Sequence, residues 1–125
     1  SAASDVYKRQ LLLILPNRSK KIISVKESVV LINRQPTILV DVRNANEFTL
    51  GRIDNSLNIP LDQLAENIDK LKKNPNKTIL VYCQKGFRSS QAVKILNKLG
   101  IDSAVSIEGG LDAWQKDNLP IKMDS

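Results

Sequence analysis

The sequence has no histidine, a single cysteine and few aromatic residues, namely one tryptophan, two tyrosines and two phenylalanines. Without histidine, the chain cannot use Cys-His or Ser-His catalysis, nor bind zinc through mixed cysteine and histidine ligands. One cysteine cannot form an internal disulfide, so the fold does not depend on an oxidising compartment. Any covalent chemistry therefore has to work without a histidine base.

The formal net charge is +6, from 19 lysine and arginine residues against 13 aspartate and glutamate residues. The basic residues are scattered, with small clusters at residues 18–21 and 70–77. A nucleic-acid-binding protein more often has a basic stripe interleaved with aromatic side chains. The pattern instead predicts solvated surfaces and an affinity for small anions, without a nucleic-acid partner.

The length of 125 residues suits one domain, which we expect at residues 20–122, followed by a tail at 123–125. Residues 1–10 resemble the translation of a sequencing adapter, and we interpret them as an artefact. Residues 11–19 are either a linker or the remnant of a truncated membrane anchor. Their run LLLIL is far shorter than the ~20 residues of a spanning helix, but a basic segment follows it, as on the cytoplasmic side of many anchors. The alternative is a short apolar segment that packs on the domain.

Apolar β-branched runs alternate along the chain with segments of helical spacing. The runs TILVDV and TILVYC are continuous, which is typical of strands buried on both faces. The predicted strands cover residues 21–24, 37–42, 56–60, 78–83 and 103–107. The predicted helices cover residues 25–34, 44–50, 61–71, 89–99 and 111–117, the first with a capping box from Ser24 to Glu27. This alternation predicts an α/β fold in three layers, with a mainly parallel central sheet of about five strands flanked by helices.

The single cysteine, Cys83, stands at the junction of a predicted strand and a predicted helix. In open parallel sheets, ligands bind beyond the carboxyl ends of the strands, and Asp41, Arg43 and Cys83 all fall at such ends. A lone cysteine is often a small buried hydrophobic residue. This placement instead favours a nucleophile.

The loop after Cys83, with the sequence CQKGFR, has the features of an anion cradle. Gly86 permits a tight turn, and successive backbone N–H groups at a helix amino terminus form a nest for an anion. Lys85 and Arg88 add positive charge, although Lys85 can equally be a solvated surface residue. Such a loop favours the thiolate form of cysteine and implies a covalent intermediate on sulfur.

The candidate site residues follow from this loop. Cys83 is the candidate nucleophile, and the substrate contacts are predicted at Gln84, Lys85, Gly86, Phe87, Arg88 and Ser89. Ser89 and Ser90 are predicted first as helix caps and only second as substrate contacts. A structural ion-pair network at the end of the first long strand is predicted from Asp41, Arg43 and Glu47. No metal site is predicted.

Two reactions fit a nucleophilic cysteine in a cationic loop. Cysteine-dependent phosphatases use Cys-x5-Arg, whereas Cys83 to Arg88 is Cys-x4-Arg, one residue shorter. Those phosphatases usually have a histidine before the cysteine, where this chain has Tyr82. The smaller loop favours an attack on sulfur over an attack on phosphate.

The chain resembles a single rhodanese domain over roughly residues 20–122. The resemblance rests on three motifs in order: ILVDVRNANEFTLGRIDNSLNIPL, VYCQKGFRSSQA and IEGGLDAWQKDNLPI. It implies a sulfurtransferase in which Cys83 takes the outer sulfur of thiosulfate or another persulfide donor, forms a persulfide and passes the sulfur to cyanide or a thiol, which can belong to a protein. No metal or organic cofactor is implied.

Two further expectations come from this resemblance. The order of the segments is similar to that of bacterial single-domain rhodaneses with one amino-terminal membrane helix, which implies a cytoplasmic protein, either free or tethered to the inner face of the membrane. A non-catalytic adaptor with the same fold is the alternative from the class of binding modules, and a phosphatase is the third reading.

Overall fold

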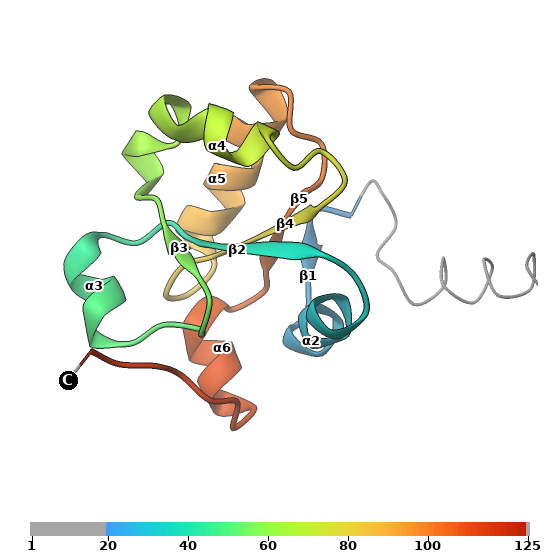
Figure 1. Cartoon of the computed structure of the whole chain (residues 1–125). Helices are drawn as coiled ribbons and strands as arrows, with labels where there is room; N and C mark the ends of the chain where they lie inside the picture. Colours follow the sequence, from blue (N-terminus) through green and yellow to red (C-terminus); the bar gives the residue numbers. More distant parts are fainter. Residues whose placement is uncertain (1–19, 125) are drawn as a thin grey trace, which may run out of the picture.

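A computed structural model of the protein describes residues 20–124 and shows a five-stranded sheet in the order β1-β5-β4-β2-β3, with every neighbouring pair parallel (Figure 1). The expectations for residues 1–19 lie outside this range. The strands are β1 (Ile22–Ile23), β2 (Thr37–Asp41), β3 (Leu57–Asn58), β4 (Thr78–Tyr82) and β5 (Ala104–Ile107). The predicted α/β fold with a parallel sheet of about five strands is confirmed.

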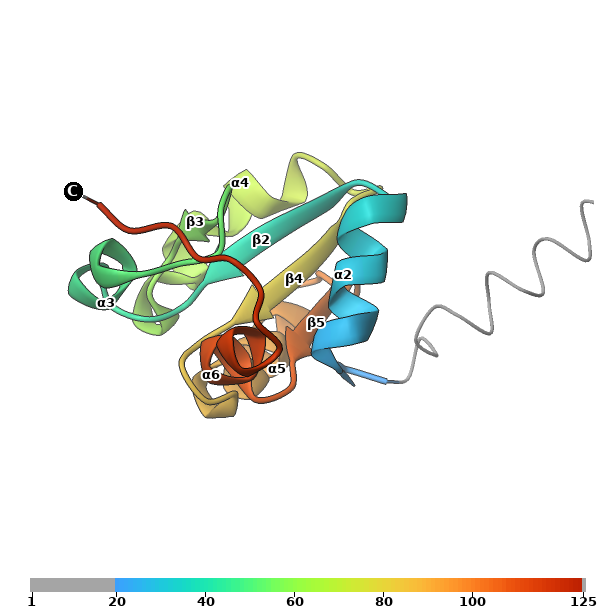
Figure 2. The same ribbon diagram turned by 90° about the horizontal axis from the view of Figure 1, so that it is seen from below.

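Helices cover both faces of the sheet. Figures 1 and 2 show α4 (Ile68–Lys72) and α5 (Phe87–Lys98) on one face, and α2 (Val25–Arg34) and α6 (Gly110–Lys116) on the other. Helix α3 (Ala45–Leu50) lies beyond the carboxyl end of β2. The three layers follow from the predominantly apolar central strands, which need cover on two sides.

Strand β4 divides the hydrophobic core, because successive side chains point to opposite faces of the sheet. Val81 packs with Leu96 of α5, whereas Tyr82 packs with Trp114 of α6. The next residue, Cys83, belongs to the cluster on the α5 side. The alternation of the strand therefore decides that the thiol faces the start of α5.

Two helices differ from the sequence expectation by more than one residue at an end. The helix predicted at 61–71 is divided into 3₁₀ turns at Leu61–Gln63 and Ala65–Asn67, followed by α4. The apolar spacing that predicts a helix fits 3₁₀ turns as well, because residues three apart share a face in both. Leu64 is completely buried in this arrangement. Helix α5 begins at Phe87, with Gly86 as its N-cap at φ +104°, so the prediction of Ser89 and Ser90 as caps is wrong.

Both ends of the described segment are held by specific contacts. The capping box of Ser24 and Glu27 is present at α2, as predicted. Near the carboxyl terminus, Arg52 pairs with Asp124 at 2.7 Å, and the Asp124 amide donates to the Thr49 carbonyl at 3.2 Å. Ordered contacts thus continue two residues past the expected domain boundary at 122. Over residues 20–124, no helix combines the length and apolar character needed to cross a membrane.

Candidate active site

Cys83 directly follows β4, and only 1% of its surface is exposed. Its Sγ accepts hydrogen bonds from the backbone N–H groups of Gly86 at 3.0 Å and Ser89 at 3.3 Å. The left-handed conformation of Gly86 turns the loop tightly enough for both amides to face the sulfur. The amino terminus of α5 therefore encloses the sulfur atom, in an arrangement that favours negative charge there.

Two buried hydroxyl groups extend this environment. Ser89 Oγ lies 3.4 Å from Cys83 Sγ and 2.7 Å from the hydroxyl of Ser106 on β5. The Ser89 hydroxyl also donates to the Gly86 carbonyl at 3.2 Å. Ser89 had been predicted as a site residue, but nothing in the local sequence pointed to Ser106. The pairing of β4 with β5 brings Ser106 beside the loop, where its hydroxyl meets that of Ser89.

Arg88 lies in the first turn of α5 and forms a two-pronged ion pair with Glu47 of α3. The distances are 2.8 Å from Nη1 to Oε1 and 3.1 Å from Nη2 to Oε2. The hydrogen bonds of this pair hold the pKa of Glu47 below and the pKa of Arg88 above their ordinary values. The positive charge of Arg88 is therefore paired with the negative charge of the Glu47 carboxylate.

Asp41 and Arg43 form a buried ion pair at the end of β2. Arg43 Nε and Nη2 donate to the carboxylate of Asp41 at 3.0 and 2.7 Å. Burial opposes the charge of Arg43, but the hydrogen bonds and charge of Asp41 outweigh it and raise the pKa of the guanidinium. Glu47 makes no hydrogen bond to this pair. The three residues of the predicted network therefore belong to two separate ion pairs, Asp41 with Arg43 and Glu47 with Arg88.

The side chain of Gln84 points away from the Cys83 sulfur and links the loop to the end of β2 and to α6. Its Oε1 accepts from Arg43 Nη1 at 2.9 Å, and its Nε2 donates to the carboxylate of Asp112 in α6. The backbone follows the same path, since the amides of Leu111 and Asp112 donate to the carbonyls of Cys83 and Gln84 at 2.8 and 3.0 Å. Gln84 thus fixes the loop against α6, and its predicted substrate contact has to compete with these hydrogen bonds.

The remaining loop residues project into solvent. Lys85 is exposed and has no ion-pair partner among residues 20–124, so its charge is available to a solute. Phe87 is 78% exposed. Within the same residues, no three histidine, cysteine, aspartate or glutamate side chains gather into a candidate metal site.

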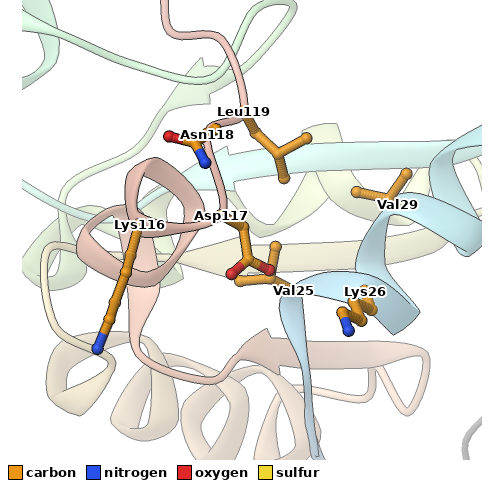
Figure 3. A pocket seen from close by; sticks show the side chains of 7 residues that line it. All are labelled: Val25, Lys26, Val29, Lys116, Asp117, Asn118 and Leu119. Carbon is orange, nitrogen blue, oxygen red and sulfur yellow. The ribbon is translucent and has the colours of Figure 1, made fainter.

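The surface formed by residues 20–124 includes two pockets of different size. The pocket beside the loop has a volume of about 210 Å³ and is lined by Arg43, Glu47, Leu50, Gly51, Gln84, Leu111, Gln115 and Ile121. A larger one of about 530 Å³ lies between α2 and the end of α6 (Figure 3). Its lining includes none of the predicted site residues. The smaller pocket is lined by Arg43, Glu47 and Gln84 of the predicted site, although not by Cys83 itself.

These features define a class of proteins: an α/β domain with a buried cysteine in a six-residue loop at the end of the central strand. The rhodanese-like domain family matches residues 24–117 of the chain, and the chain belongs to this family. A rhodanese-related protein from Thermoplasma volcanium has the same fold, with a TM-score of 0.74 and 32% identity over 83% of this chain and 99% of that one.

Relatives with assigned names include sulfurtransferases. A sulfurtransferase from Allochromatium vinosum is 30% identical over 73% of this chain and 83% of its own length. An adenylyltransferase and sulfurtransferase from Zea mays, MOCS3-1, is 38% identical over 66% of this chain. The chain spans 19% of the length of that maize protein and 34% of the length of another relative. The comparisons thus support a sulfurtransferase kind of domain.

Proposed function

We propose that the protein moves a sulfane sulfur from thiosulfate, or from another persulfide donor, to a thiophilic acceptor through a persulfide on Cys83. The acceptor is cyanide or a thiol of a small molecule or protein. The observation that carries the proposal is the convergence of the Gly86 and Ser89 amides on Cys83 Sγ at 3.0 and 3.3 Å. Two fixed donors stabilise a thiolate without a histidine base.

The first half-reaction loads the enzyme. The Cys83 thiolate attacks the outer sulfur of thiosulfate, a new S–S bond forms, and the S–S bond of thiosulfate breaks with its electron pair leaving on sulfite. In the second half-reaction, the acceptor attacks the outer sulfur of the persulfide. The bond between the two sulfurs of the persulfide then breaks, and its electron pair returns to Cys83 Sγ as the thiolate.

The residues around Cys83 have separate roles in this reaction. The backbone amides of Gly86 and Ser89 hold negative charge at the sulfur, and the exposed Lys85 attracts the anionic donor to the opening. Arg88 and Glu47 fix the first turn of α5 through their ion pair. Every bond change occurs on sulfur, so the proposal includes no metal or organic cofactor. It also places the protein in the cytoplasm, where a catalytic thiol stays reduced.

Intact-protein mass spectrometry after incubation with thiosulfate tests the proposal. We expect one added sulfur atom that maps to Cys83 and disappears on addition of cyanide, with thiocyanate as the product. Cys83→Ser should gain no sulfur, whereas Ser90→Ala, which keeps the thiol, should gain it. Wild-type protein that gains none would contradict the proposal. Thiosulfate binding without loading would point to an adaptor, and hydrolysis of an aryl phosphate at comparable rates would point to a phosphatase.

A further inference from the structure

The pocket beside the loop shares its wall with the reactive centre. Gln84 follows Cys83 directly in the chain, and Glu47, which also lines the pocket, holds Arg88 of the loop. The side chain of Gln84 turns to Arg43 and Asp112, away from the sulfur. The pocket therefore adjoins the loop that carries Cys83, on the side to which Gln84 turns.

Leu50 and Met123, two of the three most exposed large apolar side chains of residues 20–124, lie at this pocket, and the third, Phe87, is next to Arg88 of the loop. Phe87 is 78% exposed, Leu50 76% and Met123 65%. Leu50 lines the pocket, Phe87 begins α5 beside Arg88, and Met123 packs next to Gly51, another lining residue. We call Leu50, Phe87 and Met123 the apolar rim. Single exposed apolar residues are ordinary, but three at one pocket and the adjoining loop indicate a contact surface.

We propose that the acceptor is a peptide segment of a protein that carries its thiol beside apolar side chains, one of which enters the pocket while the others cover the apolar rim. The volume of about 210 Å³ is smaller than the pockets of typical small-molecule ligands and has room for one side chain. Cyanide or thiosulfate gains nothing from such a rim, because neither has apolar groups to bury. This inference rests on the proposed function and names the class of acceptor.

Two features of the site fit an extended segment better than a compact one. Cys83 is 1% exposed, so an acceptor thiol has to enter the loop from a protruding chain. The pocket also offers the side-chain amide of Gln115 and one Arg43 Nη1 N–H that is not used by Gln84, both suited to backbone groups of a peptide. The larger pocket at α2 is less suited, since Asp117 lies between Lys26 and Lys116 on a mixed-charge surface and none of the loop residues lines it (Figure 3).

Single-turnover transfer tests the inference. Protein is loaded at Cys83, freed of thiosulfate and mixed with one of two pentapeptides, whose central cysteine is flanked by leucines or by serines. In the transfer, the proton of the peptide thiol goes to the outer sulfur, and Cys83 is released as the thiolate. We expect transfer about five- to fiftyfold faster to the leucine peptide, as partial burial of one or two leucines allows. Equal rates would overturn the inference.

Surface variants test which residues cause the preference for the leucine-flanked peptide. Leu50→Ser and Met123→Ser should each lower the leucine preference at least about threefold, while Leu57→Ser, an exposed leucine on β3, should keep it. Loss of the preference in Leu57→Ser, or its retention in both rim variants, would contradict the assignment. Loading of Cys83 by thiosulfate is followed separately in each variant, so a protein that never loads refutes the proposed function and not merely the acceptor class.

Binding without transfer gives an independent measurement. A leucine peptide with serine in place of its cysteine should shift the methyl signals of Leu50, Leu111 and Ile121 in the wild-type NMR spectrum. The serine-flanked peptide should shift them less at equal concentration. Shifts confined to Val29 and Leu119, which line the larger pocket, would overturn the proposed subsite.

Discussion

Glu47 and Arg88 lie 41 residues apart in the sequence and face each other with two parallel hydrogen bonds of 2.8 and 3.1 Å. The pair joins α3 to the first turn of α5, the helix whose amino terminus encloses Cys83 Sγ. From the sequence, Arg88 was a direct anion ligand. In the structure both Nη atoms of Arg88 donate to Glu47, so a contact between Arg88 and an anionic donor has to compete with this ion pair.

The first prediction concerns this pair and thiosulfate. Arg88→Ala should lower kcat/KM for thiosulfate about ten- to a hundredfold, because the mutation loosens α5 and leaves the Glu47 carboxylate unpaired against an anionic donor. Glu47→Gln keeps the guanidinium and removes the competing charge, so it should cost less than about threefold. Steady-state kinetics at two ionic strengths measures both.

The double variant shows whether Arg88→Ala lowers activity because Glu47 then repels the anionic donor or because α5 is loosened. Glu47→Gln combined with Arg88→Ala should regain part of the activity lost in Arg88→Ala, since no unpaired carboxylate remains at the opening. Additive losses in the double variant would show that Arg88 acts on the donor independently of Glu47.

The second prediction concerns pH and stability. The ion pair holds the pKa of Glu47 below its ordinary value of 4.5, so its contribution is complete above that value and is lost as the pH falls through the lowered pKa. The contribution should be about 1 kcal/mol, because both side chains are partly exposed and solvent screens the pair. Urea unfolding at about pH 6 and about pH 3.5 should show a smaller acid loss in Glu47→Gln. Glu66→Gln, an exposed control, should match the wild type.

The third prediction concerns the buried pair of Asp41 and Arg43. Asp41→Asn removes the negative charge that faces a guanidinium only 3% exposed, so the free energy of unfolding should fall by about 3 kcal/mol. Asp54→Asn removes an exposed carboxylate that lies 3.7 Å from Lys122 and should have no measurable effect. Chemical denaturation of the two variants makes the comparison. Equal stabilities would mean that the buried pair does not hold the end of β2.

The fourth prediction concerns the contact between α6 and the loop. A Cβ on Gly110 would lie 2.3 Å from the Cys83 carbonyl oxygen, and the residue has φ +60°. Gly110→Ala should therefore destabilise the fold by about 3 kcal/mol and impair loading of Cys83, because the backbone of the loop has to move. Gly51→Ala is the control: its backbone is extended, and the new Cβ meets only side-chain atoms, the flexible end of Ile121 at 3.2 Å and Met123 Cγ at 3.9 Å. A stable, fully active Gly110→Ala protein would contradict the close packing.

Local patterns in the sequence predicted the elements well. The apolar runs predicted β2 and β4, the capping box predicted the start of α2, and Gly86 marked the turn into α5. These features depend on neighbouring residues, through periodicity, caps and backbone freedom, so they can be read without the fold. The wrong assignment of Ser89 and Ser90 as caps has the same origin, because serine is a common cap and Gly86 offered no side chain to compete with it.

The sequence by itself determined the α/β class, the parallel sheet and the place of Cys83 at the end of a central strand, since strand burial and alternation are properties of the local chain. Only the tertiary structure decided that Glu47 pairs with Arg88, that Ser106 reaches Ser89 and that Gln84 turns away from the sulfur. Each of these contacts joins segments that the strand order β1-β5-β4-β2-β3 brings together. That order depends on how the whole chain buries its apolar surface on two faces of one sheet, and no short stretch of sequence contains it.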